Sequence, residues 1–347
     1  MLVANTSFDK NHTLYVKGIA ILCLLLHHIV GSDPSIPIAF SIDNVSQILG
    51  ATCKICVSLF TILSGYGITK SWLQKKNLYN GQPNHSIFTF SLKHIWNLWK
   101  TFLIAYIFCT FLYFIQGYTF QGVYGNGWSA IWFFVKDIAG LANLIIQTPT
   151  LCGQWWFIEA TFCFYLIFPL LLWIIKKGKI PAIVLCIVTY APWMIYQWNQ
   201  GWSWHTDREL FYLFSFVIGM IFAYYNAFEQ VMERIREKKA KMTLAIVMSF
   251  CLIFVARAKW CLIVDPFLST SVIALSLLLY DMAPTIQKVF CSLGKLSADI
   301  YLIHAPFILI VSKVTINSKF TRFITLTVFC AVFAAIMKQI KKHYNLN

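Results

Sequence analysis

The chain has 347 residues, of which 59% are hydrophobic and only 12% are charged. Soluble domains contain about a quarter charged residues, so this composition excludes an ordinary globular enzyme, a disordered tail and a disulfide-rich scaffold. A membrane-spanning helix needs about 20 apolar residues, and the length therefore accommodates about ten spans with short loops. The composition predicts an all-α polytopic membrane protein, organised as a single integral-membrane domain over residues 1–347.

Apolar runs long enough to cross a bilayer as helices recur along the whole chain. One further run, at about 128–147, is interrupted by Lys136 and Asp137, and we expect it either to span or to form a re-entrant or interfacial segment. The ten predicted spans fall at about 14–31, 48–70, 97–116, 155–175, 180–198, 210–226, 242–258, 262–280, 297–313 and 322–338.

The net charge of +15 indicates the orientation of the chain in the bilayer. With the N-terminus inside and 128–147 not crossing, 19 Lys and Arg residues fall on the cytoplasmic side and 7 on the outside. Cytoplasmic loops carry such an excess, so we expect both termini in the cytoplasm and favour a re-entrant or interfacial 128–147. The segment 227–241 is then a charged cytoplasmic connector. Because the basic residues are dispersed between apolar runs, no nucleic-acid partner is expected.

The eleven cysteines do not predict a metal site or a disulfide framework. Most lie inside apolar runs, where cysteine behaves as a small hydrophobic residue. Cys53 and Cys56 form a single C-x-x-C pair with no second pair and no nearby histidine, so we interpret them as packing residues.

The first predicted span contains two ionisable residues that need an explanation, because each costs at least about 2.5–3.5 kcal/mol at bilayer depth. Lys17 and His28 are eleven residues apart, which places them within about 20° of one helix face. The rise between them is about 16 Å, so Lys17 lies near the cytoplasmic mouth and His28 in the outer half. His27 points about 100° away from this stripe. Two interpretations stay open: a functional pair, or a snorkelling lysine and a histidine that satisfies a neighbouring carbonyl.

The second predicted span carries the sequence Ser64-Gly65-Tyr66-Gly67, followed by Lys70 at its inner end. Small residues let helices approach closely, which is one interpretation of this segment. The other is a ligand groove in which Lys70 meets an anion at the cytoplasmic surface.

Two later spans also carry polar residues at membrane depth. Glu159 lies one helical turn after Trp155 and Trp156, at i+4 and i+3, so the three residues cluster. The cluster indicates either a functional carboxylate or an aromatic belt with one exposed acid. Tyr301 and His304 share a face at i and i+3, and Pro306 weakens the helix just beyond them. His304 is interpreted either as structural or as functional.

Four motifs occur in the order seen in the acyltransferase family 3 membrane proteins, which include O-antigen and other polysaccharide O-acetyltransferases. The chain resembles this family over nearly its whole length. Many members have an arginine where this chain has Lys17. The lysine keeps the positive charge of that arginine but cannot bind a phosphate through two parallel hydrogen bonds. The motifs are Lys17 with His28 after ten intervening residues; Leu59-Phe60 through Ser64-Gly65-Tyr66, with Lys70 following; Trp156, Glu159, Phe164-Tyr165 and Pro169; and Ser297, Tyr301-Leu302 and His304.

The resemblance implies a bacterial inner-membrane enzyme that moves an acyl group, acetyl by family frequency, from cytoplasmic acyl-coenzyme A to a hydroxyl of a cell-envelope carbohydrate or glycolipid. No tightly bound cofactor is expected, and acetyl-coenzyme A is the donor substrate. His28 is then either a general base or a transient acyl carrier. The implied catalytic residues are His28, Lys17 and Glu159; the donor-binding residues are Lys17, Ser64, Tyr66 and Lys70; and the acceptor-binding residues are Trp156, Tyr301 and His304.

The alternative function is a transporter or channel, in which the intramembrane histidines, lysines and Glu159 form a proton or solute path. No inverted repeat is apparent, which disfavours it. A scaffold in envelope synthesis is a third interpretation. The sequence leaves open the acceptor, the acyl chain and the oligomeric state.

Overall fold

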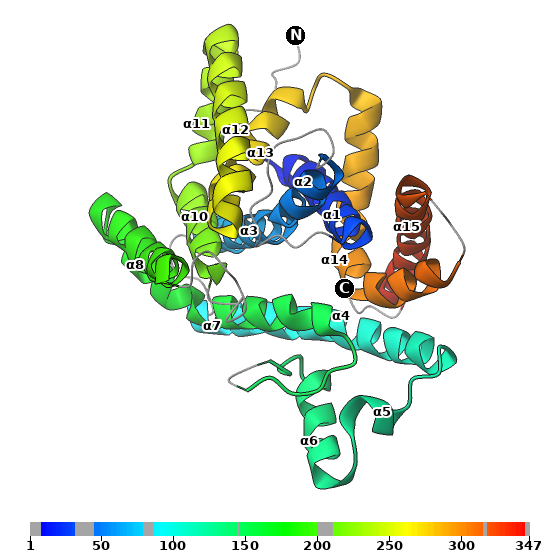
Figure 1. The fold of residues 1–347 in the computed structure, drawn as a ribbon. Coiled ribbons are helices and arrows are strands. Elements are labelled where there is room, and N and C mark those ends of the chain that lie inside the picture. The colour runs from blue at the N-terminus through cyan, green and yellow to red at the C-terminus, as the bar shows by residue number, and fades with distance from the viewer. Residues whose placement is uncertain are drawn as a thin grey trace. The chain divides into compact units, whose positions relative to one another are not determined.

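The structure is a computed structural model that describes residues 8–31, 45–78, 86–143, 146–199, 211–314 and 318–343. Helices make up almost all of these residues, and no strand occurs among them (Figure 1). The all-α prediction is confirmed. The helices are α1 (Lys10–Val30), α2 (Val45–Thr52), α3 (Ile55–Leu78), α4 (Ile87–Ile115), α5 (Phe120–Tyr124), α6 (Gly127–Ile138), η2 (Gly153–Trp155), α7 (Trp156–Lys176), α8 (Lys179–Asn199), α10 (Leu213–Tyr224), α11 (Ala227–Glu237), α12 (Lys239–Trp260), η3 (Cys261–Val264), α13 (Asp265–Leu279), α14 (Pro284–Lys313) and α15 (Lys319–His343).

Nine helical stretches among the described residues are long and apolar enough to cross a membrane, and each coincides with a predicted span. The remaining predicted span, 210–226, corresponds to α10, whose 12 residues extend about 18 Å. Its predecessor segment, 200–210, lies outside the described residues. The helix α6 also has 12 residues and is not among the nine stretches long enough to cross a 30 Å hydrocarbon core.

The chain divides into two compact units. The first comprises Met1–Asn84 and Leu170–Ser297, and the second comprises His85–Pro169 and Ala298–Asn347. The boundary falls within α7 and α14.

In the first unit, α3 packs against α1, α10 and α13 (Figure 1). The approach of α3 and α10 depends on two glycines: a Cβ at Gly65 would overlap the main-chain carbonyl of Phe216, and a Cβ at Gly219 would overlap that of Ile62. A Cβ at Gly67, in contrast, would meet nothing within 4 Å. Gly65 is therefore explained by close helix packing, one of the two interpretations of the Ser64–Gly67 segment, whereas Gly67 is not.

In the second unit, the side chain of Asp137 links α6 to α5 and to the segment that precedes η2. Its carboxylate is 2% exposed and accepts hydrogen bonds from the Tyr124 hydroxyl at 2.6 Å, the Thr150 hydroxyl at 2.6 Å and the Leu151 N–H at 2.8 Å. Burial raises the pKa of Asp137 above its ordinary value, although these hydrogen bonds act in the opposite direction. The acid that interrupts the 128–147 run thus fixes this segment in place. A second buried acid, Asp299 on α14, forms an ion pair with Lys341 on α15.

The α3–α10 crossing can be tested with a matched pair of glycine substitutions. We expect Gly219→Ala to destabilise the protein by about 1–3 kcal/mol, because the new methyl group meets the backbone of α3. Gly67→Ala should have no such cost. Thermal unfolding of the purified variants in detergent measures both, and an unfolding temperature unchanged by Gly219→Ala would contradict the close approach.

Candidate active site

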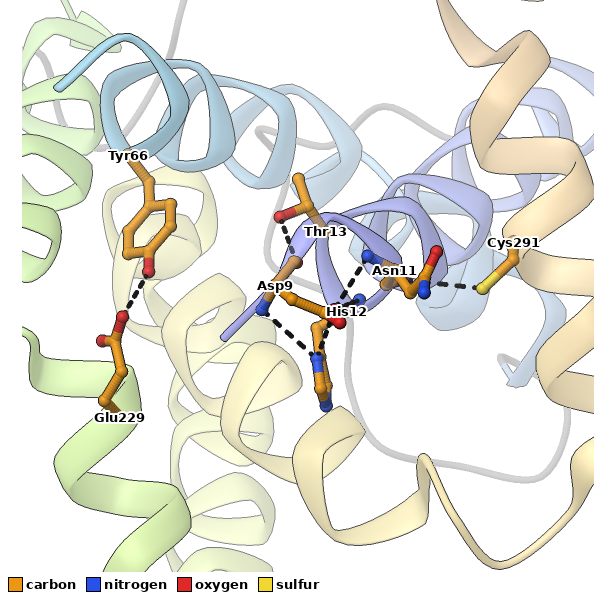
Figure 2. Close-up of polar contacts among 7 residues, drawn as sticks. All are labelled: Asp9, Asn11, His12, Thr13, Tyr66, Glu229 and Cys291. Atoms are coloured by element: carbon orange, nitrogen blue, oxygen red, sulfur yellow. Dashed lines mark hydrogen bonds and ion pairs between the residues drawn. The ribbon is translucent and has the colours of Figure 1, made fainter. Parts of the chain in front are cut away.

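The start and the end of α1 are both capped, which keeps Lys17 and His28 on one continuous helix. At the N-terminus, the Asp9 side chain accepts hydrogen bonds from the N–H groups of Asn11 at 2.8 Å and His12 at 3.0 Å (Figure 2). Burial raises the pKa of Asp9, but these hydrogen bonds and the His12 ring outweigh it and hold that pKa below its ordinary value. At the C-terminus, Gly31 adopts a left-handed conformation, with φ of 68°, and ends the helix.

Lys17 is half-buried on α1, and among the described residues no carboxylate forms an ion pair with it. A cation at membrane depth is costly unless it is paired, solvated or used. His28 is also half-buried, and its ring centroid lies 5.4 Å from that of His27. The first unit therefore holds a cation suited to an anionic ligand and an imidazole on the same helix.

Tyr66 and Lys70 lie one turn apart on α3 and meet at a single carboxylate, Glu229 of α11. Figure 2 shows the contact between Tyr66 and Glu229. The Tyr66 hydroxyl donates to Glu229 Oε1 at 3.0 Å, and Lys70 Nζ approaches the same oxygen at 2.6 Å. Lys70 also donates to Asn226 Oδ1 at 2.6 Å, and Asn226 has the left-handed φ of 53°. Lys70, which the sequence assigned to the donor's anion, is thus paired with an acid, while Ser64 is half-buried on the same helix.

Glu229 belongs to the segment 227–241, which the sequence analysis interpreted as a solvated connector. Part of that segment is the helix α11, and its Phe228 is buried against Phe8 and Tyr66, with ring centroids 4.6 Å and 5.3 Å apart. An open cavity of about 550 Å³ adjoins the Lys70–Glu229 pair. Three glutamates and one arginine make its lining acidic, which disfavours a polyphosphate there; the lining residues are Asn226, Glu229, Gln230, Glu233, Arg236 and Glu237.

In the second unit, the N-terminal end of α7 holds Trp156 and Glu159. Glu159 is 1% exposed, and its Oε2 accepts the N–H of Asn143 at 2.8 Å. The aromatic-belt interpretation with an exposed acid is therefore wrong, because the carboxylate is buried. Its position in the first turn of α7 is favourable, since the helix N-terminus carries partial positive charge. Trp156 is also buried, with its ring 5.9 Å from that of Phe157.

Tyr301 and His304 lie on α14 and contact the main chain around the start of α7. The Tyr301 hydroxyl donates to the Gln154 carbonyl at 2.5 Å. The fully buried His304 ring places Nδ1 2.6 Å from the carbonyl of Tyr301. A carbonyl only accepts, so Nδ1 carries the proton. The predicted acceptor-binding role of Tyr301 thus competes with a hydrogen bond that its hydroxyl already makes.

Pro306 interrupts the hydrogen bonding of α14, and a residue outside this helix compensates for it. Proline has no N–H, so the carbonyl of Leu302 loses its helical donor. The indole N–H of Trp155 donates to that carbonyl at 2.9 Å, which ties the start of α7 to α14. The proline within the α14 run was the available signal for this contact. The sequence placed Trp155 beside Glu159 and gave no sign that its indole binds Leu302.

The structure thus gathers the predicted residues in two sets. Comparison with known proteins identifies the family of the chain. The model of the acyltransferase domain, acyltransferase family 3, matches residues 13–337, which is nearly the whole chain. The chain belongs to this family and is a membrane acyltransferase. No curated protein and no solved structure matches it. The first unit contains Lys17, His28, Ser64, Tyr66 and Lys70, and the second contains Trp156, Glu159, Tyr301 and His304.

The contact between α3 and α11 can be tested by proteolysis. We expect Glu229→Gln to increase the rate of trypsin cleavage within 227–241, because the charge that holds Lys70 is lost and α11 loosens. Glu233 lies one turn further along α11, is exposed, and forms no ion pair with any described residue, so Glu233→Gln is the matched control. Equal cleavage rates in the two variants would contradict the role of Glu229.

The contact of Glu159 can be tested by thermal unfolding in detergent. Glu159→Gln keeps an oxygen that accepts the Asn143 N–H, and its unfolding temperature should stay close to that of the unmodified protein. Glu159→Ala removes the acceptor and should cost about 1–3 kcal/mol. The same unfolding temperature for both variants would show that this hydrogen bond does not support the fold.

Proposed function

We propose that the protein transfers an acyl group, acetyl in the first instance, from acyl-coenzyme A to a hydroxyl group of a cell-envelope carbohydrate or glycolipid. The observation that carries this proposal is the half-buried Lys17, which has no carboxylate partner among the described residues and lies on the same helix as His28. Membership of acyltransferase family 3 supplies the reaction class.

Lys17 suits the donor because coenzyme A is polyanionic and its phosphates need a cation. Lys17 lies seven residues into α1, about 10 Å from the start of the helix, on the side that the basic-residue distribution assigns to the cytoplasm. Lys70 lies at the end of α3 that the same topology places inside, but its ammonium is shared with Glu229. Lys17 is therefore the stronger candidate for the donor's phosphates.

His28 suits the transfer step because a neutral imidazole accepts a proton near neutral pH. As a general base it takes the proton of the acceptor hydroxyl, whose oxygen then attacks the thioester carbonyl. The carbon–sulfur bond breaks, and the thiolate of coenzyme A leaves and takes up a proton. As an acyl carrier, the imidazole nitrogen instead attacks the thioester carbonyl, the carbon–sulfur bond breaks and coenzyme A leaves as the thiol. The acceptor hydroxyl then loses its proton and attacks the acyl-imidazole, and the carbon–nitrogen bond breaks to release the imidazole.

The proposed location is the bacterial inner membrane, with both termini in the cytoplasm. With Lys17 at the cytoplasmic side, the rise of about 16 Å to His28 supports a position of the imidazole in the outer half of the bilayer. This depth supports an acceptor that approaches from outside, so that the acyl group crosses part of the membrane during catalysis.

The His28 variant tests the chemistry. We expect His28→Ala to lower acyl transfer by at least about 10²-fold, the lower end of the range for a lost general base, while insertion and unfolding temperature stay unchanged. The assay is release of coenzyme A thiol from acetyl-coenzyme A by the purified protein. Transfer at the unmodified rate would remove histidine chemistry from the proposal.

The Lys17 variants test the donor site. Lys17→Ala should raise the KM for acetyl-coenzyme A about 10-fold or more, the effect of one lost charge-assisted hydrogen bond, whereas Lys17→Arg should retain most of the affinity. Lys10→Ala is the matched control, because Lys10 is exposed on the first turn of the same helix. Equal KM values for Lys17→Ala and Lys17→Arg would show that the charge has no role.

A further inference from the structure

The predicted second span is not one helix but two, and the break between them leaves a main-chain carbonyl without its helical donor. In a continuous helix the carbonyl of Gly50 would accept the N–H of Lys54. That N–H donates instead to the carbonyl of Ala51 at 3.2 Å. Within lipid no water replaces the lost partner, so a protein group has to supply the hydrogen bond to Gly50.

The side chain of His27 supplies it. Its Nδ1 lies 2.8 Å from the carbonyl oxygen of Gly50 and, because that oxygen only accepts, Nδ1 carries the proton. The main-chain carbonyl of His27 accepts the N–H of Gly31, the residue that ends α1, at 3.0 Å. The last turn of α1 is thus held by His27 through both its ring and its backbone.

Arg257 of α12 holds the break from another side. Its guanidinium donates to the carbonyl of Ala51 at 3.0 Å and forms an ion pair with Asp265 at 2.5 Å. Arg257 is 2% exposed and Asp265 is fully buried, so this charge pair is enclosed in the first unit. Two consecutive carbonyls, those of Gly50 and Ala51, are therefore bound by side chains from α1 and α12.

We infer that His27 is a positioning residue for the reaction, and that its hydrogen bond to Gly50 fixes the last turn of α1 and with it the direction of the His28 ring. The two rings lie 5.4 Å apart on consecutive residues, so a rotation of this turn moves both. The inference rests on the proposed function, in which His28 acts on the acyl group. In this role His27 acts through His28 and takes no part in the transfer itself.

Two amide substitutions separate positioning from direct catalysis. The side-chain nitrogen of asparagine lies close to the place of Nδ1, whereas that of glutamine extends to the place of Nε2. We expect His27→Asn to retain kcat within about threefold, and His27→Gln and His27→Ala to lower kcat about tenfold or more, with the KM for acetyl-coenzyme A unchanged. The pH profile of kcat in His27→Asn should match that of the unmodified protein.

Equal loss in His27→Asn and His27→Gln would overturn the inference, because the imidazole itself would then be required. Full activity in all three variants would overturn it as well. Thermal unfolding gives a readout independent of the reaction: His27→Asn should unfold at a higher temperature than His27→Gln. The proposed function would fail through a different variant, if His28→Ala transferred the acyl group at the unmodified rate. The activities of the His27 variants and of His28→Ala therefore distinguish a failure of this inference from a failure of the proposed function.

Discussion

The structure depends on one constraint: within lipid, each main-chain carbonyl that loses its helical donor has to find another. Two cases among the described residues show how this is met. At Pro306 the missing N–H releases the carbonyl of Leu302, which the indole of Trp155 binds. At the break between α2 and α3 the carbonyl of Gly50 is bound by His27. Both hydrogen bonds lie beside residues of the family motifs: Trp155 precedes Trp156, and His27 precedes His28. The irregular helices and the candidate site residues therefore occur together.

The distribution of charge inside the protein follows the same constraint. Three buried or half-buried acids meet a cation or several donors: Glu229 meets Lys70, Asp265 meets Arg257, and Asp137 accepts hydrogen bonds from its own unit. Lys17 differs, since no described carboxylate pairs with it. A charge that the fold does not neutralise is the feature that a polyanionic donor would use.

The all-α membrane architecture could be predicted from the sequence, because apolar runs long enough to span a bilayer can be recognised in it without any tertiary contact. The sequence was also sufficient to place Lys17 and His28 on one helix. It did not reveal the break at Cys53 and Lys54, because the run is long enough to span as one helix and contains no proline there. Glu229 and Trp155 were missed for a further reason: their partners, Lys70 and Leu302, are over a hundred residues away, and only folding brings them together. The burial of Glu159 likewise depends on a contact with Asn143 that spacing does not encode.

The central claim is that this membrane protein binds acyl-coenzyme A and releases its thiol by transferring the acyl group to a hydroxyl. The most direct measurement uses purified protein in sealed vesicles of known orientation, with radiolabelled acetyl-coenzyme A supplied to the cytoplasmic face alone. The account predicts stoichiometric thiol release and label on a carbohydrate or glycolipid acceptor. Folded protein that neither binds coenzyme A nor releases thiol, with envelope glycans present, would contradict it.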